Sequence, residues 1–262
     1  MDNFADDLRL AHVLGDTVER YTMQMFHSAE LEVAAKSDGS LVTQADEHVE
    51  QAMRSQLARS RPRDVVQGEE LPTTGHGDRR WIIDPIDGTT NYIRGVPIWA
   101  SLIALVVQDE PVLGLVAAPA LQRRWWAAAG SGAWTGRSLS QARQIWVSDT
   151  SRVEHASLSH AALDKWWRHR QRSGFLDLAR ACWRTRGYGD FWTHCLVAEG
   201  AVDIGVDPSL ALHDMAALAP IVTEAGGRFS DLDGVDGPFG VGAVSSNGLL
   251  HEPALDALLG QG

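Results

Sequence analysis

The segment WIIDPIDGTTN, residues 81–91, carries the strongest structural signal in this sequence. It begins as an apolar run rich in isoleucine, which is typical of a buried strand, and it ends with Asp84, Asp87 and Gly88. A strand that simply ends in a turn often uses Asp-Gly, so a turn with no further role is the alternative interpretation. A second carboxylate three residues earlier favours a functional site.

Length and composition predict a globular protein with a large core. The chain has 262 residues, of which 44% are hydrophobic, so it can bury a core without disulfides. Its two cysteines, Cys182 and Cys195, are too few for a disulfide framework. The acidic N-terminus does not resemble a signal peptide, and no apolar run approaches the ~18 residues of a spanning helix. We therefore expect a cytoplasmic protein with no membrane partner.

The net charge of −11 argues against a nucleic acid as a partner, because affinity for a phosphate backbone requires clustered Lys and Arg. The two short basic clusters, at residues 57–64 and 165–172, are expected to be solvated helix ends. A protein of this charge that handles phosphate has to recruit cations at its site.

Apolar periodicity predicts two helices near the N-terminus. Five apolar residues recur at spacings of three and four and predict one buried face on the first helix: Ala11, Leu14, Val18, Tyr21 and Met25. The second helix is expected after KSDGSLVTQAD (36–46), with Asp46 near its start.

Strands are expected to follow these helices. DVVQGEE (64–70) and RRWIIDPID (79–87) are predicted to be strands that end in acids, and residues 99–120 an antiparallel hairpin that residues 123–136 extend. After about residue 150 short apolar strands alternate with helices. We expect two halves, residues 1–150 and 151–262, in one compact unit, because no Pro/Gly/Ser-rich linker separates them.

Glu69, Asp84 and Asp87 predict a site for a hard divalent cation. Mg²⁺ prefers oxygen ligands and is usually held by a few carboxylates and a substrate phosphate. Residues three apart on a regular strand face opposite sides, but Pro85 interrupts the ladder and allows the carbonyl of Ile86 to turn outward. Both aspartates can then meet one metal cluster.

Gly88, Thr89 and Thr90 predict an anion site beside these carboxylates. If a helix begins here, its free N–H groups bind an anion, and Gly88 lets the backbone approach a phosphate closely. Carboxylates for metals next to N–H groups for an anion predict metal-assisted phosphoryl transfer or phosphate hydrolysis.

The same residues resemble the inositol monophosphatase family of metal-dependent, lithium-sensitive phosphatases. GEE (68–70), WIIDPIDGTTN (81–91) and HDMAALAPIVTEAGG (213–227) are similar to its three signature regions, in order and at suitable distances. KSDGSLVTQAD is similar to the segment before the family's second helix. The combination is specific, whereas DGT alone would be a weak signal.

The resemblance implies an α/β fold, a layered α/β/α/β/α sandwich of the inositol monophosphatase and fructose-bisphosphatase type. It implies Mg²⁺ as cofactor, with two or three ions per site and Mn²⁺ as a substitute, and a homodimer. The N-terminal half then carries most of the metal ligands and the C-terminal half the last of them. The implied ligands are Glu69, Asp84, the Ile86 carbonyl, Asp87 and Asp214.

The resemblance also implies three groups that orient and deprotonate the attacking water: Glu70, Asp46 and Thr89. The Thr89 hydroxyl can pass its proton to Asp46, which is a reason for an acid at that position. The alternative for Asp46 is a helix cap and nothing more.

Within the family, four stretches are more similar to bacterial histidinol-phosphate phosphatases of the actinobacterial kind: residues 94–105, 118–128, 186–204 and 245–251. They imply hydrolysis of L-histidinol phosphate to L-histidinol and phosphate in histidine biosynthesis. Inositol 1-phosphate and a nucleotide 3′-phosphate are the alternative substrates. A non-enzymatic binding or regulatory relative is disfavoured, because every expected carboxylate is present.

Histidinol phosphate has an anionic end and a cationic end, so its site should be cationic near the phosphate and acidic beyond it. The resemblance implies that Arg186 contacts the substrate directly. Asp190 and Glu199 are the candidates to face the cationic end, and Asn247 is a candidate to meet an imidazole nitrogen. The alternative for these residues is a salt-bridge network or a subunit interface. The phosphate end is assigned to Asp87, Gly88, Thr89, Thr90 and Asp214.

Two residues depart from the family pattern. His213 stands where the family usually has Trp, and Asp207 where it commonly has Glu. His213 is either a pH-sensitive donor or a smaller packing residue, and we expect packing.

Overall fold

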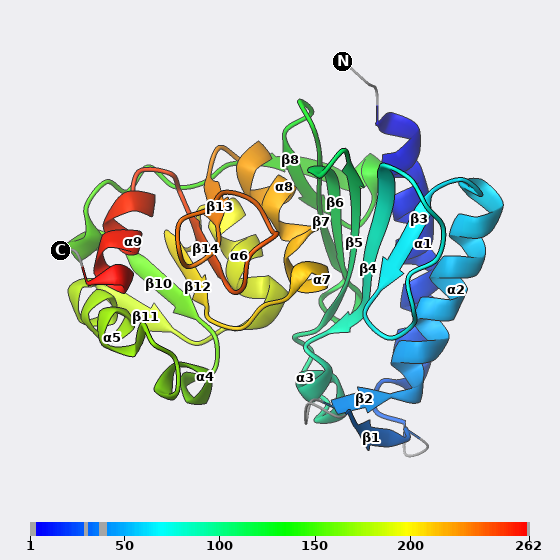
Figure 1. Cartoon of the computed structure of the whole chain (residues 1–262), viewed down its shortest axis with the longest axis horizontal. Coiled ribbons are helices and arrows are strands. Elements are labelled where there is room, and N and C mark those ends of the chain that lie inside the picture. Colours follow the sequence, from blue (N-terminus) through cyan, green and yellow to red (C-terminus); the bar gives the residue numbers. More distant parts are fainter. Residues whose placement is uncertain (1–3, 29–30, 37–40, 261–262) are drawn as a thin grey trace.

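The computed structural model describes residues 4–28, 31–36 and 41–260. Figure 1 shows five layers, which follow one another from right to left as helices, sheet, helices, sheet and helices. The predicted α/β/α/β/α sandwich is confirmed.

Helices α1 (Ala5–Met25) and α2 (Gln44–Ser60) form the first layer and pack on the first sheet. The buried face of α1 includes Ala11, Leu14 and Val18, as predicted, but Tyr21 is exposed and Thr22 is buried in its place. The spacing of four thus continues from Val18 to Thr22. Between the helices, β1 (Val33–Ala35) pairs antiparallel with β2 (Leu41–Thr43); residues 37–40 lie outside the described residues.

The second layer is a seven-stranded sheet in chain order, with β3 parallel to β4 and all other neighbours antiparallel. The predicted hairpin of β5 and β6 is confirmed, and its turn lies at Gln108 and Asp109, which both have positive φ. The short helix α3 (Thr89–Ile93) follows β4. The strands are β3 (Val65–Gly68), β4 (Arg79–Asp87), β5 (Ala100–Val107), β6 (Glu110–Ala118), β7 (Arg123–Ala128), β8 (Ala133–Gly136) and β9 (Ala142–Ile145).

The third layer consists of α6 (Asp190–Ala198), α7 (Leu212–Met215) and α8 (Leu218–Glu224). Helix α8 packs on β6 and β7 on one side and on β13 on the other. One hydrophobic cluster therefore includes residues of both sheets, such as Val116, Trp125 and Phe229. Trp81, Trp99 and Trp166 are also fully buried.

The fourth layer is a five-stranded sheet in the order β11-β10-β12-β14-β13, in which β10 is parallel to both β11 and β12. Helices α4 (Leu163–Trp167), α5 (Arg172–Ala181) and α9 (His251–Leu259) form the outer layer. The strands of the five-stranded sheet are β10 (Ser157–His160), β11 (Arg184–Arg186), β12 (Ile204–Asp207), β13 (Arg228–Ser230) and β14 (Ala243–Ser246).

No helix within the described residues is both long and apolar enough to cross a membrane. In the part of the chain that the structure describes, three short 3₁₀ helices lie between the other elements, at Pro119–Leu121, Leu139–Gln141 and Val153–His155. The C-terminal end of β4 and the start of α7 meet, and this junction brings the acidic residues together.

Candidate active site

A bulge in β4 places Asp84 and Asp87 on the same side of the sheet. Asp84 pairs with Leu102 and Asp87 pairs with Ala100, so β4 has one more residue than β5 between these pairs. In a regular strand two residues three apart face opposite sides, and the extra residue cancels that alternation.

The backbone around Pro85 leaves the regular ladder at this bulge. The Ser101 hydroxyl donates to the carbonyl of Pro85, and the Thr89 hydroxyl donates to the carbonyl of Ile86 at 2.9 Å. The irregularity predicted from Pro85 is therefore present.

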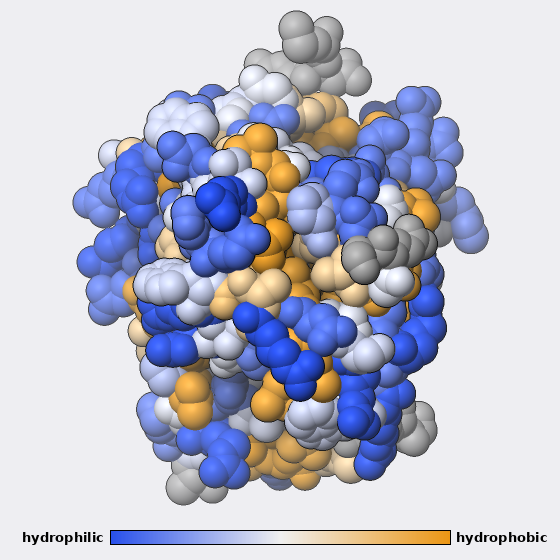
Figure 2. Space-filling view, turned by 90° about the vertical axis from the view of Figure 1, so that its left-hand side faces the viewer, coloured by the Kyte–Doolittle hydropathy of each residue, from blue (hydrophilic) through white to orange (hydrophobic). Residues whose placement is uncertain are grey.

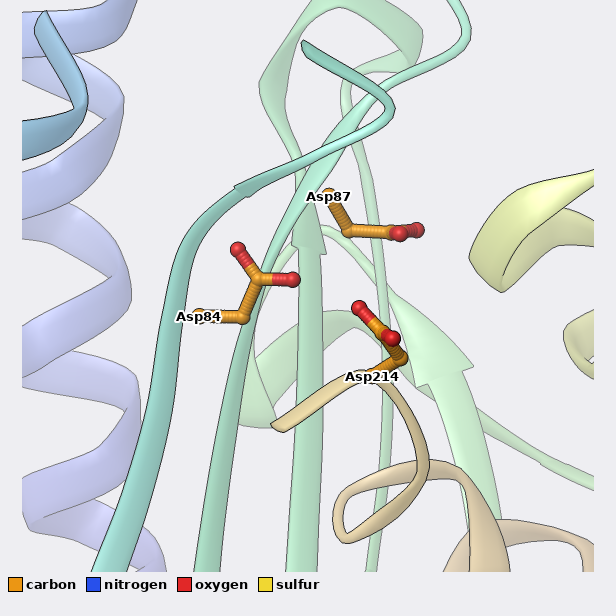
Figure 3. A group of neighbouring side chains, drawn as sticks. All are labelled: Asp84, Asp87 and Asp214. Atoms are coloured by element: carbon orange, nitrogen blue, oxygen red, sulfur yellow. The ribbon is translucent and has the colours of Figure 1, made fainter. Parts of the chain in front are cut away.

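Asp214 completes a group of three carboxylates. It lies in α7, where its carboxylate accepts the Ala211 N–H at 2.6 Å. One oxygen atom from each of Asp84, Asp87 and Asp214 lies within 4.8 Å of the other two. Figure 3 shows the carboxylates of β4 and of α7 pointing into the same space. Carboxylates so close to one another need protons or cations between them.

Burial raises the pKa of Asp84 well above its ordinary value, and repulsion from Glu69 and Asp87 raises it further. Burial likewise raises the pKa of Asp87, with Asp190 as the next cause. Asp84 Oδ1 is buried and has no hydrogen-bond partner in the described part of the chain. An orphaned carboxylate oxygen in an all-oxygen cluster fits a hard divalent cation such as Mg²⁺.

Glu50, on the buried face of α2, positions the segment that carries the two neighbouring glutamates. Its carboxylate accepts the N–H groups of Glu70 at 2.7 Å and Leu71 at 3.1 Å, and Arg54 Nε at 2.8 Å. A Cβ on Gly68 would lie 2.1 Å from Glu50 Oε1, so a larger residue there would displace the Glu50 carboxylate. We did not single out Glu50 from the sequence, although its four-residue spacing from Asp46 and Arg54 places three charged residues on one helix face.

Lys36 lies against the predicted metal ligand Glu69. Its Nζ is 2.6 Å from Glu69 Oε1 and 2.6 Å from Glu70 Oε1. Burial lowers the pKa of Lys36, but the hydrogen bonds to both glutamates outweigh it, so the pKa is raised. Glu69 also interacts electrostatically with Asp84 and Asp214, which places it at the same cluster.

Asp46 caps α2 with one oxygen and leaves the other free. Oδ2 accepts the N–H of Thr43 at 2.8 Å and its hydroxyl at 2.6 Å. Oδ1 is buried without a hydrogen-bond partner among the described residues, and burial raises the pKa of Asp46 to about 6. The helix cap therefore uses only one of the two carboxylate oxygens of Asp46. No hydrogen bond between Asp46 and Thr89 is found within residues 4–28, 31–36 and 41–260, so the predicted proton relay stays a prediction.

Gly88 adopts a left-handed conformation, with φ of 82°, directly before α3. A Cβ there would lie 3.0 Å from the Ile98 carbonyl and 3.4 Å from Asp190 Oδ2. The first N–H groups of a helix have no partner within it, so those after Gly88 are available to an anion beside the carboxylates. Thr90 is exposed at this point.

Asp190 begins α6 with a positive φ of 50°, which is strained for a residue with a Cβ. The next N–H, of Phe191, donates to Asp87 Oδ2 at 2.7 Å, and Asn91 Nδ2 donates to Asp190 Oδ2 at 3.3 Å. This geometry ties α6 to the end of β4 and to α3. Arg186 is exposed at the end of β11 and donates to the Thr185 carbonyl at 2.7 Å.

Within one chain, two predicted substrate contacts, Glu199 and Asn247, are not brought to the carboxylate cluster. Glu199 is at the opposite end of α6 from Asp190, and its carboxylate accepts Arg123, Arg143 and the Trp125 indole N–H. The two arginines supply the positive charge that we expected Glu199 to meet on a substrate. Within one chain, Glu199 therefore belongs to a salt-bridge network, which was the alternative interpretation.

Asn247 lies beyond the end of β14 that pairs with Ile204, whereas the other end pairs with Asp207. Its side chain donates to Ser148 and Thr150 and accepts the Leu250 N–H at 3.1 Å. Within one chain, Asn247 is therefore not brought to the carboxylate cluster.

The two departures from the family pattern both face the cluster. Asp207 is buried; its Oδ1 accepts the Ser209 N–H at 3.0 Å, while Oδ2 has no partner in the described residues, and burial raises its pKa to about 6. His213 Nε2 lies 3.6 Å from Asp214 Oδ1. This distance favours an electrostatic contact over the packing role that we expected.

Sequence comparison agrees with this geometry. The model of the inositol monophosphatase family matches residues 3–259. The chain belongs to this family. Its members are metal-dependent phosphatases, and the group of Asp84, Asp87 and Asp214 fits that chemistry.

Individual relatives cover almost the whole chain. The histidinol-phosphatase of Streptomyces coelicolor is 52% identical over 98% of this chain and 98% of its own length. The histidinol-phosphatase of Mycobacterium tuberculosis is 48% identical over 97% of this chain and 98% of its own length. Among solved structures, an inositol monophosphatase from Zymomonas mobilis has a TM-score of 0.86 and 32% identity, and covers 99% of this chain and 100% of its own.

Proposed function

We propose that this family member is a Mg²⁺-dependent phosphatase that hydrolyses L-histidinol phosphate to L-histidinol and phosphate. The observation that carries the chemistry is the convergence of Asp84, Asp87 and Asp214 within 4.8 Å. The substrate is supported by two relatives, about half identical to this chain, that are both named histidinol-phosphatase.

Five residues would hold two or three Mg²⁺ ions, with Mn²⁺ as a substitute: Glu69, Asp84, the Ile86 carbonyl, Asp87 and Asp214. A bound divalent cation polarises a phosphate ester and promotes ionisation of a water molecule. The surrounding acids supply the negative charge that holds such ions between the two sheets.

Glu70, Thr89 and Asp46 would prepare the attacking water. The Glu70 N–H donates to the Glu50 carboxylate, so the backbone that carries the Glu70 side chain is held in place. The free Oδ1 of Asp46 is a proton acceptor whose pKa of about 6 suits exchange near neutral pH. For this proton transfer, the Thr89 hydroxyl would leave the Ile86 carbonyl when the site is loaded.

Gly88, Thr89 and Thr90 would bind the phosphate through their N–H groups. Arg186 would contact the substrate near the phosphate or its ester chain, and Asp190 would face the amine. The positions of two residues support these roles. Asp190 accepts a hydrogen bond from Asn91, three residues after Gly88, and Arg186 is the last residue of β11, which pairs with β10.

We also propose a cytoplasmic homodimer. β11 is an outer strand of its sheet, and Trp183 beside it is 69% exposed. Figure 2, which views the left-hand face of Figure 1, shows a strip of hydrophobic residues between hydrophilic ones. A second copy that packs on this face would cover that strip.

The test is phosphate release from histidinol phosphate, inositol 1-phosphate and adenosine 3′,5′-bisphosphate with saturating Mg²⁺. We expect kcat/KM to be highest for histidinol phosphate. A preference for inositol 1-phosphate would assign the alternative activity, which the likeness to solved inositol monophosphatases favours. No hydrolysis of any of them would contradict the enzymatic proposal.

A further inference from the structure

The segment after β3 carries Glu69 and Glu70 to the carboxylate cluster. Gly68, the last residue of β3, pairs with Ile83, which directly precedes Asp84 in β4. Glu69 therefore leaves the sheet next to Asp84. Beyond Gly68 the chain lies outside the ladder, so its backbone groups need partners from other elements.

Two side chains of α2, Glu50 and Arg54, supply these partners. The Glu50 carboxylate accepts the Glu70 N–H through Oε2 at 2.7 Å and the Leu71 N–H through Oε1 at 3.1 Å. Arg54 donates through Nη2 to the Leu71 carbonyl at 2.8 Å. Its Nε donates to Glu50 Oε1 at 2.8 Å, so the two charges also balance each other. One ion pair of the helix thus binds two N–H groups and a carbonyl group of the segment.

This ion pair is closely packed. Glu50 is 0% exposed and Arg54 is 8% exposed. A Cβ on Gly68 would lie 2.1 Å from Glu50 Oε1, so the backbone of the segment runs directly against the carboxylate. Three N–H groups converge on this carboxylate, and an amide in its place would turn its own NH₂ group toward at least one of them. A glutamine therefore cannot replace Glu50 without loss of a hydrogen bond in a buried network.

We propose that Glu50 is a positioning residue of the metal site, because its carboxylate fixes the backbone that carries Glu69 and Glu70. This inference rests on the proposed function, in which Glu69 binds Mg²⁺ and Glu70 orients the attacking water. The charge of Glu50 is already balanced by Arg54, so Glu50 acts through geometry. Both the affinity for Mg²⁺ and the rate of turnover then depend on a side chain that lies behind the cluster, in α2.

The test is Glu50→Gln, which keeps the length of the side chain and removes one acceptor. Calorimetric titration of Mg²⁺ into the metal-free protein should give a dissociation constant about tenfold higher than that of the wild type. With saturating Mg²⁺, kcat for histidinol phosphate should fall about tenfold. KM should change less than about twofold, because the groups that bind the substrate are left in place.

Glu224→Gln is the matched control. The Glu224 carboxylate also accepts two backbone N–H groups of a turn, from Gly130 at 2.8 Å and Gly132 at 2.7 Å. This turn joins β7 to β8 at the end of the sheet opposite Asp87, so the control should keep the wild-type Mg²⁺ affinity and kcat. Gly68→Ala is a second variant, which displaces the Glu50 carboxylate without removing it and should weaken Mg²⁺ binding as Glu50→Gln does.

A double-mutant cycle separates positioning from stability. If Glu50 acts on turnover through Glu70, Glu50→Gln should lower kcat less than about twofold in a protein that already carries Glu70→Gln. The same loss of kcat in both backgrounds would overturn the inference, and so would wild-type Mg²⁺ affinity and kcat in Glu50→Gln. If Glu50→Gln does not fold, wild-type Mg²⁺ affinity in Gly68→Ala would overturn it. A wild type that binds no Mg²⁺ would overturn the proposed function and this inference together.

Discussion

Asp84 lies at the bulge of β4 with one carboxylate oxygen buried and unpaired among the described residues, and Asp87 shares the cluster. We expect Asp84→Asn and Asp87→Asn each to lower kcat/KM about a hundredfold or more, a larger loss than most neighbours of metal ligands cause. The fold should persist, because a neutral amide removes charge repulsion. Phosphate release over a Mg²⁺ titration and circular dichroism measure both effects. The control is Asp109→Asn in the exposed turn; near-normal activity of either site variant would contradict the metal assignment.

Glu69 and Glu70 are adjacent but have different surroundings. Glu69 interacts with Asp84 and Asp214, whereas the Glu70 backbone is bonded to Glu50. We expect Glu69→Gln to weaken Mg²⁺ binding more than Glu70→Gln, and Glu70→Gln to act mainly on kcat. Calorimetric Mg²⁺ titrations and initial rates separate the two effects. Equal loss of Mg²⁺ affinity would show that both are ligands.

The turn between β4 and α3 depends on a left-handed glycine. Gly88→Ala should destabilise the protein by about 1–2 kcal/mol, since the position has a positive φ and the Cβ would crowd the Ile98 carbonyl. It should also weaken inhibition by inorganic phosphate, because the N–H groups after it shift. Gly130→Ala is the matched control: its φ is also positive, but its Cβ would meet nothing within 4 Å. Urea unfolding and phosphate inhibition test both, and identical behaviour would show that only backbone strain matters.

The local elements were predictable from the sequence wherever periodicity or a turn residue defined them. The hairpin of β5 and β6 and the start of α2 near Asp46 follow from such signals. The position of Glu199 could not be predicted in this way. Its partners Arg123 and Arg143 come from β7 and β9, and pairing between distant segments leaves no local pattern in the sequence. Tyr21 was misplaced for a different reason, since a helix face continues equally well through Thr22.

The active site as a whole depends on contacts between the two sheets. The motifs and the family resemblance predicted that Asp84, Asp87 and Asp214 share one site, and the packing of α7 against the end of β4 brings the three carboxylates together. Asp207 was noted as a departure from the family, but its burial and free oxygen could not be inferred without the fold. The boundary near residue 150 stays a prediction, because one hydrophobic cluster joins both halves.

The junction of the two sheets also predicts how the whole molecule responds to pH without metal. Burial raises the pKa of Asp46 and of Asp207 to about 6 each, above the ~3.9 of an unfolded chain. The folded state then binds more protons than the unfolded state, so stability falls as pH rises. Each of these two carboxyls contributes about 3 kcal/mol to the free energy of unfolding. This contribution is complete below about pH 4 and is lost as the pH rises through about 6.

We therefore expect the free energy of unfolding in EDTA to be lower at about pH 7.5 than at about pH 5, and Mg²⁺ to restore stability at the higher pH by binding only the folded state. Urea titrations at both pH values, with EDTA or with Mg²⁺, measure this. Asp46→Asn should remove about half of the change that these two carboxyls cause, because one of them no longer titrates, whereas Asp109→Asn should leave it intact. A metal-free protein that gains stability over this range would show that the buried acids are already neutralised by other groups of the protein.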